Sequence, residues 1–333
     1  SGSSIMPRKS TWPWIASLVL TGLLAAADSS KPPLGLDAYL PTPPDNPLTP
    51  ERVALGRELF FEKRLSRDGS VSCATCHDPE LGYTDKEPVA VGVDGQQGTR
   101  RTPRLINRAY GKSFFWDGRS ASLEEQVLKP IANPIEMDLA VEDAVELLRS
   151  DAAYPAKFEA AFAGEPTSER LAFALAAYVR TILSGDSPYD RYLAGHETAL
   201  TAAQRRGLEL FRGKAACAVC HVGPNLTDER FHNTGVGWAD GNHADEGRAA
   251  ITGASADLGA FKTPPLREVA LTGPYMHDGS LETLEDVIEF YDEGGEDNPN
   301  LDFDMQPLNL TDSEKADLVA FLEALNGVVQ EGP

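Results

Sequence analysis

Two short stretches, Cys73-Ala74-Thr75-Cys76-His77 and Cys217-Ala218-Val219-Cys220-His221, decide the fold of this 333-residue chain. Each has the spacing Cys-x-x-Cys-His, the pattern by which c-type haem is attached to a protein. The two thiols bond covalently to the haem vinyl groups, and the adjacent histidine reaches the iron from one face. All four cysteines of the chain are used in this way. The sequence therefore predicts two covalently bound haem c groups, with His77 and His221 as iron ligands.

Two other uses of paired cysteines compete with this interpretation. A four-cysteine zinc site would leave His77 and His221 without a role, and its two cysteine pairs would lie about 140 residues apart. A redox-active Cys-x-x-Cys pair needs no histidine in the next position. Because only haem attachment uses both histidines, it explains more of the pattern.

Composition limits the classes of function. The chain has 51 Asp and Glu against 30 Lys and Arg, a formal net charge of −21, and 41% hydrophobic residues. This is an ordinary globular composition, and the length suggests two domains. So large a negative charge argues against binding nucleic acid or an anionic membrane by bulk electrostatics.

The first residues have the pattern of a secretory signal peptide. A basic pair at 8–9 precedes the apolar run 12–24, which is followed by three alanines, so we expect residues 1–27 to be removed. The run is shorter than the ~20 residues of a spanning helix, and we expect no stable membrane anchor. Met6 has the character of a natural start, with residues 1–5 an upstream remnant. The predicted location is the periplasm of a Gram-negative cell.

An internal repeat surrounds the two haem motifs. Gly56-Arg57-Glu58-Leu59-Phe60 precedes the first motif and Gly207-Leu208-Glu209-Leu210-Phe211 precedes the second, each after a threonine that could cap a helix. Downstream, Trp116-Asp117-Gly118 and His277-Asp278-Gly279 begin two further segments that match in spacing. The predicted fold is mainly α, with two cytochrome c-like haem domains related by this repeat and joined by long loops.

The domain limits follow from the repeat and from composition. We expect a Pro-rich arm at 28–50, an N-terminal domain at 51–190 and a C-terminal domain at 191–333. Each half should close with an amphipathic helix, near 168–183 and near 311–325.

The ligand opposite each iron separates electron transfer from chemistry. After His77 there is no histidine before His196, and Met137 is the only methionine between them. The first haem therefore lacks an obvious sixth ligand from its own domain. An open iron of this kind can bind peroxide.

The repeat also compares the distal positions of the two haems. Fourteen residues after Trp116 comes Pro130, and fourteen after His277 comes Tyr291. Proline cannot bind iron, whereas tyrosinate can, and it stabilises the ferric and higher oxidation states. The spacing alone leaves ligation and core packing of Tyr291 equally open, and Met276 is a rival ligand. His277 is a further candidate for contact with a haem.

Peroxide cleavage needs a group that moves a proton between the two peroxide oxygens. Gln126 and Glu136 flank Pro130, and Glu136 stands out because its neighbours are mostly apolar. We take Glu136 and Gln126 as the candidate proton-handling pair.

Together these segments resemble the bacterial di-haem cytochrome c peroxidases and the related MauG proteins, over nearly the whole chain after the signal. The resemblance rests on the two haem motifs and on the segments 115–119, 125–126, 130–137, 231–236, 261–264 and 274–279. It implies a peroxidatic first haem, with Gln126, Pro130 and Glu136 lining its distal pocket. It also implies that Trp116 conducts electrons between the haems. Tyr291 matches a methionine of ordinary peroxidases and a tyrosine of MauG, which favours ligation.

The resemblance also implies a calcium ion between the domains, bound through the carbonyls of Thr272 and Pro274. At the position of the family's calcium-binding asparagine this chain has Arg101. An arginine could replace the charge of the ion, so the sequence leaves calcium open. Lys262 and Arg267 are candidates to pair with the haem propionates.

Three functions remain open at this stage. The first is a MauG-like enzyme that uses hydrogen peroxide to form a two-iron state near Fe(IV) and oxidises a partner protein. The second is a cytochrome c peroxidase that removes peroxide with electrons from a small cytochrome or copper protein. The third is a non-enzymatic di-haem electron carrier, which the missing histidine in residues 78–195 disfavours.

Overall fold

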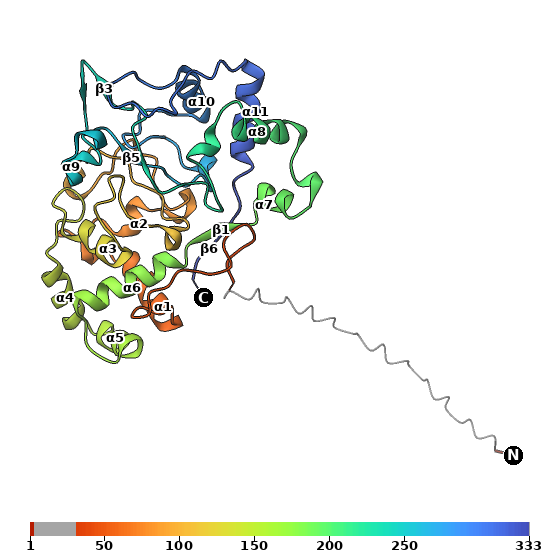
Figure 1. The fold of residues 1–333 in the computed structure, drawn as a ribbon. Helices are drawn as coiled ribbons and strands as arrows, with labels where there is room; N and C mark the ends of the chain where they lie inside the picture. Colours follow the sequence, from red (N-terminus) through yellow and green to blue (C-terminus); the bar gives the residue numbers. More distant parts are fainter. Residues whose placement is uncertain (3–30, 333) are drawn as a thin grey trace.

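The computed structural model describes residues 1–2 and 31–332 (Figure 1). Apart from residues 1–2, the predicted signal peptide lies outside the described residues. The prediction of a mainly α fold with two cytochrome c-like halves is confirmed. None of the described helices combines the length and the apolarity needed to cross a bilayer.

Eleven helices and six short strands form the described structure. The helices of the first half are α1 (Pro50–Phe60), α2 (Cys73–Cys76), α3 (Leu123–Ala132), α4 (Val141–Ser150), α5 (Tyr154–Phe162) and α6 (Ser168–Arg180). Those of the second half are α7 (Pro188–Leu193), α8 (Ala202–Arg212), α9 (Ala249–Thr252), α10 (Leu284–Glu293) and α11 (Asp312–Glu323). The strands are β1 (Leu183–Gly185), β2 (Phe231–His232), β3 (Trp238–Ala239), β4 (Asn242–His243), β5 (Phe261–Lys262) and β6 (Val328–Gln330). They pair antiparallel as β1–β6, β2–β5 and β3–β4.

The helix that leads into each haem motif, α1 in the first half and α8 in the second, begins at a threonine, as the sequence predicts. Thr49 accepts a hydrogen bond from the backbone N–H of Arg52, and Thr201 accepts one from that of Gln204. These bonds satisfy amide groups that have no partner within the helix. They fix where α1 and α8 start, and therefore where each chain segment enters its haem motif.

Each half is built on a helix crossing at a glycine. An added Cβ at Gly56 of α1 would lie 1.9 Å from the carbonyl oxygen of Ala174 in α6. The same atom at Gly207 of α8 would lie 1.9 Å from the carbonyl oxygen of Asp317 in α11. Since only glycine permits so close an approach, the repeated glycine sets the spacing of both helix pairs.

The same crossings carry matching aromatic contacts. The rings of Phe60 and Tyr178 lie 5.1 Å apart in the first half, and those of Phe211 and Phe321 lie 5.1 Å apart in the second. Each pair is edge-on and belongs to the hydrophobic core of its own half. The internal repeat is therefore structural as well as sequential.

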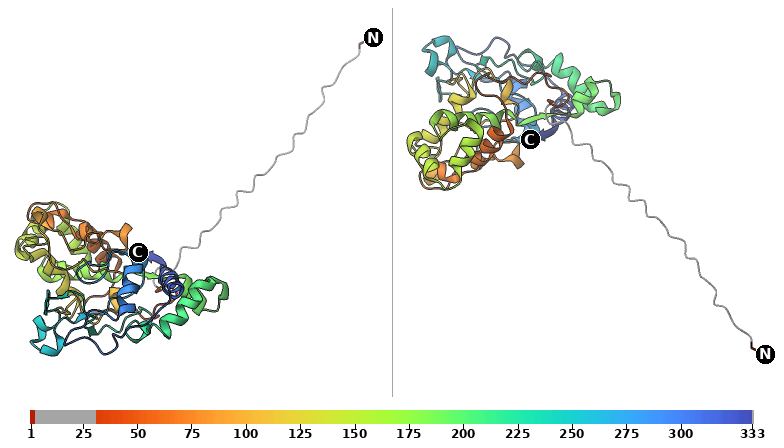
Figure 2. Two further views of the ribbon diagram at one scale, coloured as in Figure 1. Left: turned by 90° about the horizontal axis from the view of Figure 1, so that it is seen from above. Right: turned by 90° about the horizontal axis from the view of Figure 1, so that it is seen from below.

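A two-stranded sheet joins the halves. Strand β1 directly follows α6, and β6 follows α11, so the end of the second half returns to the first (Figures 1 and 2). Ser184 in β1 exchanges backbone hydrogen bonds with the side chain of Asn107, and its hydroxyl donates to Glu268. Asn107 and Glu268 occupy matching positions of the repeat, so both halves hold this strand.

We expect Gly56→Ala and Gly207→Ala each to lower the free energy of unfolding by about 1–3 kcal/mol, because the new methyl group must push two helices apart. Denaturant unfolding followed by far-UV circular dichroism measures the change. Ala202→Ser, at an exposed position of α8, is the control. Unchanged stability in both glycine variants would contradict the close crossing.

Candidate haem-binding site

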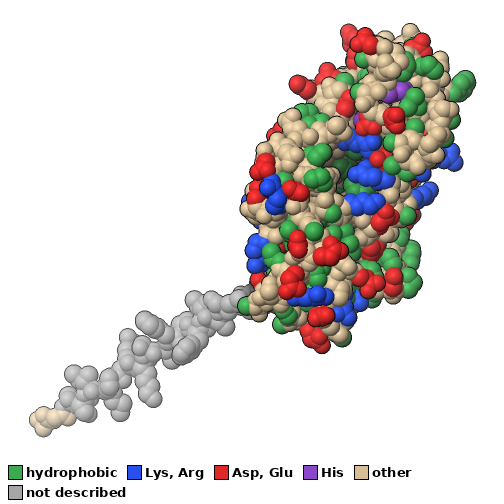
Figure 3. Space-filling view, turned by 90° about the vertical axis from the view of Figure 1, so that its left-hand side faces the viewer, with side chains coloured by type: hydrophobic (Ala, Val, Ile, Leu, Met, Phe, Trp, Pro, Cys, Tyr) green, Lys and Arg blue, Asp and Glu red, His purple; other side chains and the backbone are tan. Residues whose placement is uncertain are grey.

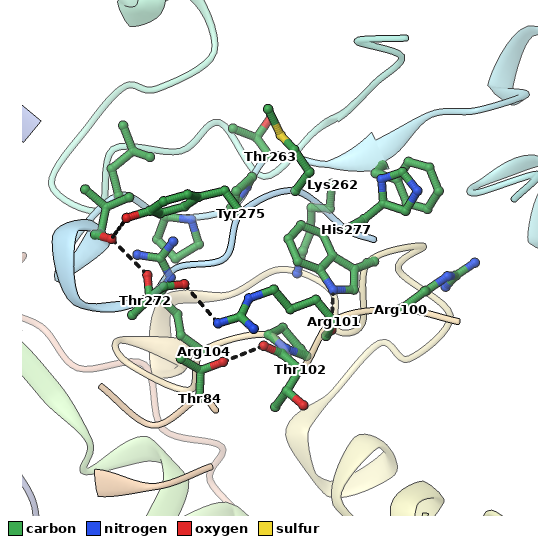
Figure 4. A pocket seen from close by; sticks show the side chains of 18 of the residues that line it. Thr84, Arg100, Arg101, Thr102, Arg104, Lys262, Thr263, Thr272, Tyr275 and His277 are labelled. Carbon is green, nitrogen blue, oxygen red and sulfur yellow. Dashed lines mark hydrogen bonds between the residues drawn. The ribbon is translucent and has the colours of Figure 1, made fainter. Parts of the chain in front are cut away.

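One large cavity lies between the two halves and is lined by both Cys-x-x-Cys-His motifs. Cys73, Cys76 and His77 reach it from the first half, and Cys217, Cys220 and His221 reach it from the second. The side chains labelled in Figure 4 come from segments 84–104 and 262–277 and surround the same space. The structure therefore brings the two predicted attachment sites to one enclosure.

Both histidines are held in the orientation that ligation requires. The Nδ1 atom of His77 lies 3.1 Å from the carbonyl oxygen of Tyr83, and that of His221 lies 2.9 Å from the carbonyl oxygen of Leu226. A carbonyl can only accept, so Nδ1 carries the proton and Nε2 is free to bind a metal. Burial lowers the pKa of each histidine to about 4, which keeps both rings neutral.

The cysteines do not have the properties of a redox pair or of a zinc site. Burial raises the pKa of the Cys73, Cys76 and Cys217 thiols to about 12, whereas redox-active cysteines have lowered pKa values. Across residues 31–332, the four thiols do not converge into one cluster of possible metal ligands. Paired thiols beside a neutral imidazole, facing a largely apolar cavity, fit covalent attachment of a porphyrin in each half.

The predicted distal residues of the first haem line the cavity. Gln126 and Pro130 are on α3, and Glu136 follows that helix by four residues. The carboxylate of Glu136 accepts a hydrogen bond of 2.7 Å from Asn133 Nδ2. Burial raises the pKa of Glu136, an effect that the Asn133 bond and the charge of Arg119 partly oppose. A carboxyl group with a raised pKa beside an open site is suited to accept and return a proton.

Tyr291 occupies the matching place in the second half. It lies seven residues after Leu284, the first residue of α10, as Pro130 lies seven residues after Leu123 on α3. The phenol lines the cavity, and burial raises its pKa. Met276 lines the cavity too, so both candidate ligands have access to it.

Trp116 and His277, which match in the repeat, are connected through one residue. The indole Nε1 of Trp116 donates to the carbonyl of Arg101 at 2.9 Å, and the backbone N–H of Arg101 donates to the carbonyl of His277 at 2.7 Å. The ring of His277 stacks on Phe261, with centroids 3.5 Å apart. Trp116, His277 and Phe261 all line the cavity.

The prediction for Arg267 needs correction. Its guanidinium forms two hydrogen bonds with Asp190, at 2.7 and 2.9 Å, and two more with the carbonyls of Pro224 and Gly35. It does not line the cavity. Because these partners occupy its donors and it lies outside the cavity lining, it is not available to pair with a propionate.

Lys262 and Arg104 are two of the cations that do face the cavity. Lys262 lies on its wall, 3.6 Å from Glu229, and burial with the nearby charge of Arg108 lowers its pKa to about 7. Arg104, which the sequence did not single out, also lines the cavity, and burial lowers its pKa to about 10. An anionic group in the cavity would relieve both shifts, so Lys262 and Arg104 fit haem propionates.

Basic groups are concentrated at the cavity although the chain is acidic. Six cationic residues contribute to its lining: Arg100, Arg101, Arg104, Arg108, Arg119 and Lys262. Figure 3 shows Lys and Arg side chains gathered around a hollow on one face of the molecule. Buried cations of this kind stabilise anions bound in the cavity.

The guanidinium of Arg101 lies among carbonyl oxygens of both halves, one of which belongs to Thr272, a predicted calcium ligand. Its guanidinium donates to the carbonyl of Thr272 at 2.9 Å and to that of Gly273 at 3.2 Å, on the second half. It also donates to the carbonyls of Asp85 at 2.7 Å and Glu87 at 2.6 Å, on the first half. Figure 4 shows the bond to Thr272. Pro274, the other predicted calcium ligand, lines the cavity without a bond to Arg101.

Comparison with known proteins agrees with this geometry. Residues 50–198 match the family described as di-haem cytochrome c peroxidase, and residues 204–326 match the cytochrome c family. The chain is 48% identical over 288 residues to methylamine utilization protein MauG of Methylorubrum extorquens, covering 86% of this chain and 81% of that protein. It is 38% identical over 343 residues to cytochrome-c peroxidase IdrP1 of Denitromonas iodatirespirans, covering 94% and 91%.

A solved structure is also similar throughout. It is described as a MauG-like protein associated with microbial copper homeostasis, and it superposes with a TM-score of 0.82 at 35% identity. The match covers 95% of this chain and 96% of that one.

We expect the protein to be independent of calcium, because Arg101 already places a positive charge among the carbonyls that join the two halves. A chelator should leave the thermal midpoint unchanged. Arg101→Leu should lower the free energy of unfolding by about 3–5 kcal/mol, since it leaves Asp85 without its buried partner.

Arg67→Leu is the matched control, because its ion pairs with Asp94 and Asp138 are exposed and should contribute at most about 1 kcal/mol. A chelator that lowers the thermal midpoint of the unmodified protein would show that a metal ion is bound after all.

Proposed function

Because the chain belongs to the family of di-haem cytochrome c peroxidases and MauG proteins, we propose that it uses hydrogen peroxide to oxidise a partner protein, as a MauG-like enzyme. Family membership makes it an oxidoreductase with two haem c groups and sets aside the non-enzymatic carrier. The observation that supports the MauG-like assignment is the contrast between the two ends of one cavity. Glu136 lies near enough to Cys73 and Cys76 to help raise the pKa of their thiols, and the buried phenol of Tyr291 has the same electrostatic relation to Cys217 and Cys220. Pro130 lines the cavity from α3 of the first half.

In this proposal residues 51–190 form the peroxidatic domain and residues 191–333 the electron-transfer domain. When bound, the haems would supply the iron centres at which the O–O bond of peroxide is broken. Reduction of one peroxide to two waters consumes two protons and two electrons. The electrons come from the partner protein. The residues of this chain transfer the protons and provide the route along which the electrons move.

Glu136 is the proton-transfer group of this proposal. Its carboxylate is oriented by Asn133, and its backbone carbonyl accepts a hydrogen bond of 2.9 Å from the N–H of Val93. Gly92 approaches the same backbone so closely that an added Cβ would lie 2.4 Å from the Glu136 carbonyl oxygen. These contacts fix the carboxyl group at the cavity wall. Gln126 adds an amide on the same wall, where it can orient the peroxide.

Tyr291 distinguishes this proposal from an ordinary peroxidase. Its pKa is raised by burial, so the phenol keeps its proton unless a positive centre binds the oxygen. A metal ion favours the phenolate as it does other anionic ligands. We propose that Tyr291 binds the second iron through this oxygen. Trp116, half-buried between the motifs, then lies on the route by which electrons pass between the haems.

The alternative within the family is removal of peroxide with a small cytochrome or copper protein as electron donor. Peroxide consumption by the purified di-haem protein, with and without a reduced small cytochrome c, separates the two. A MauG-like enzyme should show little stimulation by that donor and should instead modify its protein substrate. Rapid steady turnover with the cytochrome would favour the peroxidase. We propose a periplasmic location for either reaction, from the signal pattern and the c-type attachment motifs.

We expect Glu136→Gln to slow peroxide consumption by about 10²- to 10⁴-fold, because the amide cannot take a proton. In the unmodified protein the acid limb of the rate should have its midpoint above the ordinary glutamate value of 4.5, since the base must lose its proton first. The variant should lose this acid limb. Stopped-flow assays across pH measure both.

The stability of this variant provides a second check. A raised carboxyl pKa means that the ionised form costs stability above that pKa, and that the cost disappears as pH falls and the group is protonated. Glu136→Gln should therefore be at least as stable as the unmodified protein at pH 7. Glu142→Gln, an exposed position on α4, is the control. Loss of activity together with loss of folding would point to a structural role instead.

We expect Tyr291→Phe to change the resting EPR signal of the second haem only, and to slow oxidation of the partner protein at least about tenfold. Phenylalanine fills nearly the same space but offers no oxygen to the iron. Tyr275→Phe is the matched control, because Tyr275 also lines the cavity and its hydroxyl donates to the carbonyl of Val269 at 3.1 Å. If Met276→Leu changes the signal and Tyr291→Phe does not, Met276 is the ligand.

A further inference from the structure

The segment after α11 places a half-buried carboxylate against the core of the first half. Strand β6 pairs with β1, and the residue after it, Glu331, accepts a hydrogen bond of 2.6 Å from the hydroxyl of Tyr83. The same carboxylate oxygen accepts from the hydroxyl of Tyr178, and the other oxygen lies 3.1 Å from a guanidinium nitrogen of Arg57. Tyr83 and Tyr178 are almost completely buried. One anion from the second half thus anchors two core tyrosines of the first.

Tyr83 is also the residue whose carbonyl accepts the Nδ1 proton of His77. Its φ of +57° lies in the left-handed region, which costs free energy for any residue other than glycine. This conformation turns the carbonyl toward His77 while the ring points into the core beside Phe60, 6.3 Å from centroid to centroid. A strained backbone conformation persists only where the surrounding contacts stabilise it. One such contact is the hydrogen bond from the Tyr83 hydroxyl to Glu331, which fixes the end of the side chain.

The second half lacks such an anchor. His221 is oriented by the carbonyl of Leu226, which is also left-handed with a φ of +54°. Leu226 is buried and apolar, so its side chain is held by packing in the second core, and its backbone N–H donates to the carbonyl of Gly223 at 3.1 Å. In both halves, a left-handed residue supplies the carbonyl that orients the histidine. An anion holds the side chain of that residue in the first half, and apolar contacts hold it in the second.

We propose that Glu331 is a positioning residue for the haem bound by His77. Its carboxylate fixes Tyr83, and Tyr83 fixes the direction and strength of the hydrogen bond at His77 Nδ1. A strong acceptor at Nδ1 makes the imidazole a better electron donor to a metal bound at Nε2. Since Glu331 follows the last helix of the second half, docking of that segment also sets the electronic character of the first haem. This inference relies on the proposed function only in that His77 binds a haem.

Glu331→Ala and Tyr83→Phe test the proposal on the resting di-haem protein, before any peroxide is added. Each should raise the reduction potential of the His77 haem and lower its ferrous iron–histidine stretching frequency in resonance Raman spectra. The signals of the His221 haem should stay unchanged. The double variant should show no larger shift than either single one, because both changes break the same chain of contacts. Peroxide consumption should fall about tenfold, the lower end of the range for groups that support a metal ligand.

Glu331→Gln keeps an oxygen that both tyrosine hydroxyls can use. The reduction potential and Raman frequency of its His77 haem should therefore stay close to those of the unmodified protein. Glu323→Ala, an exposed carboxylate at the end of α11, is the control and should change nothing. The proposal fails if the His77 haem keeps its potential in both single variants, or if both haems shift together as the fold loosens. Potentials and Raman frequencies do not depend on turnover, so a protein that failed to consume peroxide would still decide this question.

Discussion

The hydrogen bond from each haem-motif histidine to a backbone carbonyl is the contact on which the rest of the structure depends. It fixes the proton on Nδ1 and leaves Nε2 for the iron, and it works only if the ring is buried and neutral. Both acceptor carbonyls belong to left-handed residues, Tyr83 and Leu226, a conformation that the surrounding core must impose. The crossings of α1 with α6 and of α8 with α11 build these cores. The glycine in each crossing is therefore a requirement for placing the iron ligand, although it lies outside the cavity.

The repeat gives the two halves one framework, and the chemistry is found where the halves differ. Gly56 and Gly207 make the same contact, as do the aromatic pairs beside them. Pro130 and Tyr291 share a helix position, yet only one of them can bind iron. Trp116 and His277 share a turn position of the repeat and are linked through the backbone of Arg101. A duplicated domain can keep its folding contacts while these few positions diverge, because the divergent side chains face the cavity and not the cores.

The sequence was sufficient for those features that are local in the chain. The haem motifs, the helix-capping threonines and the matched spacing of Pro130 and Tyr291 all depend on residues close together, and the structure places them as the spacing indicates. The predicted propionate role of Arg267 is wrong, because its guanidinium is bound to Asp190. Asp190 is 77 positions away in the chain, and no sequence pattern indicates this pairing. Arg104 and Glu331 were missed for the same reason. The contacts of these two residues come from segments that are distant in the chain. The sequence alone does not show whether a charged residue will be buried.

Arg101 shows how far such an environment can be inferred. Its place before Thr102-Pro103 raises the question whether an arginine replaces the charge of a calcium ion, and the structure shows four carbonyl oxygens around its guanidinium. Several carbonyl oxygens from the two halves point to one place, where their negative partial charges repel one another. Either a calcium ion or a guanidinium can stabilise this arrangement with its positive charge. The guanidinium does so with a charge that cannot dissociate and with five directed donors. Arg101 also accepts from Trp116 and donates to His277 through its backbone, so the residue that joins the halves is hydrogen-bonded to the tryptophan of the proposed electron path. Any loosening of the interface would therefore alter the spacing of the two redox centres.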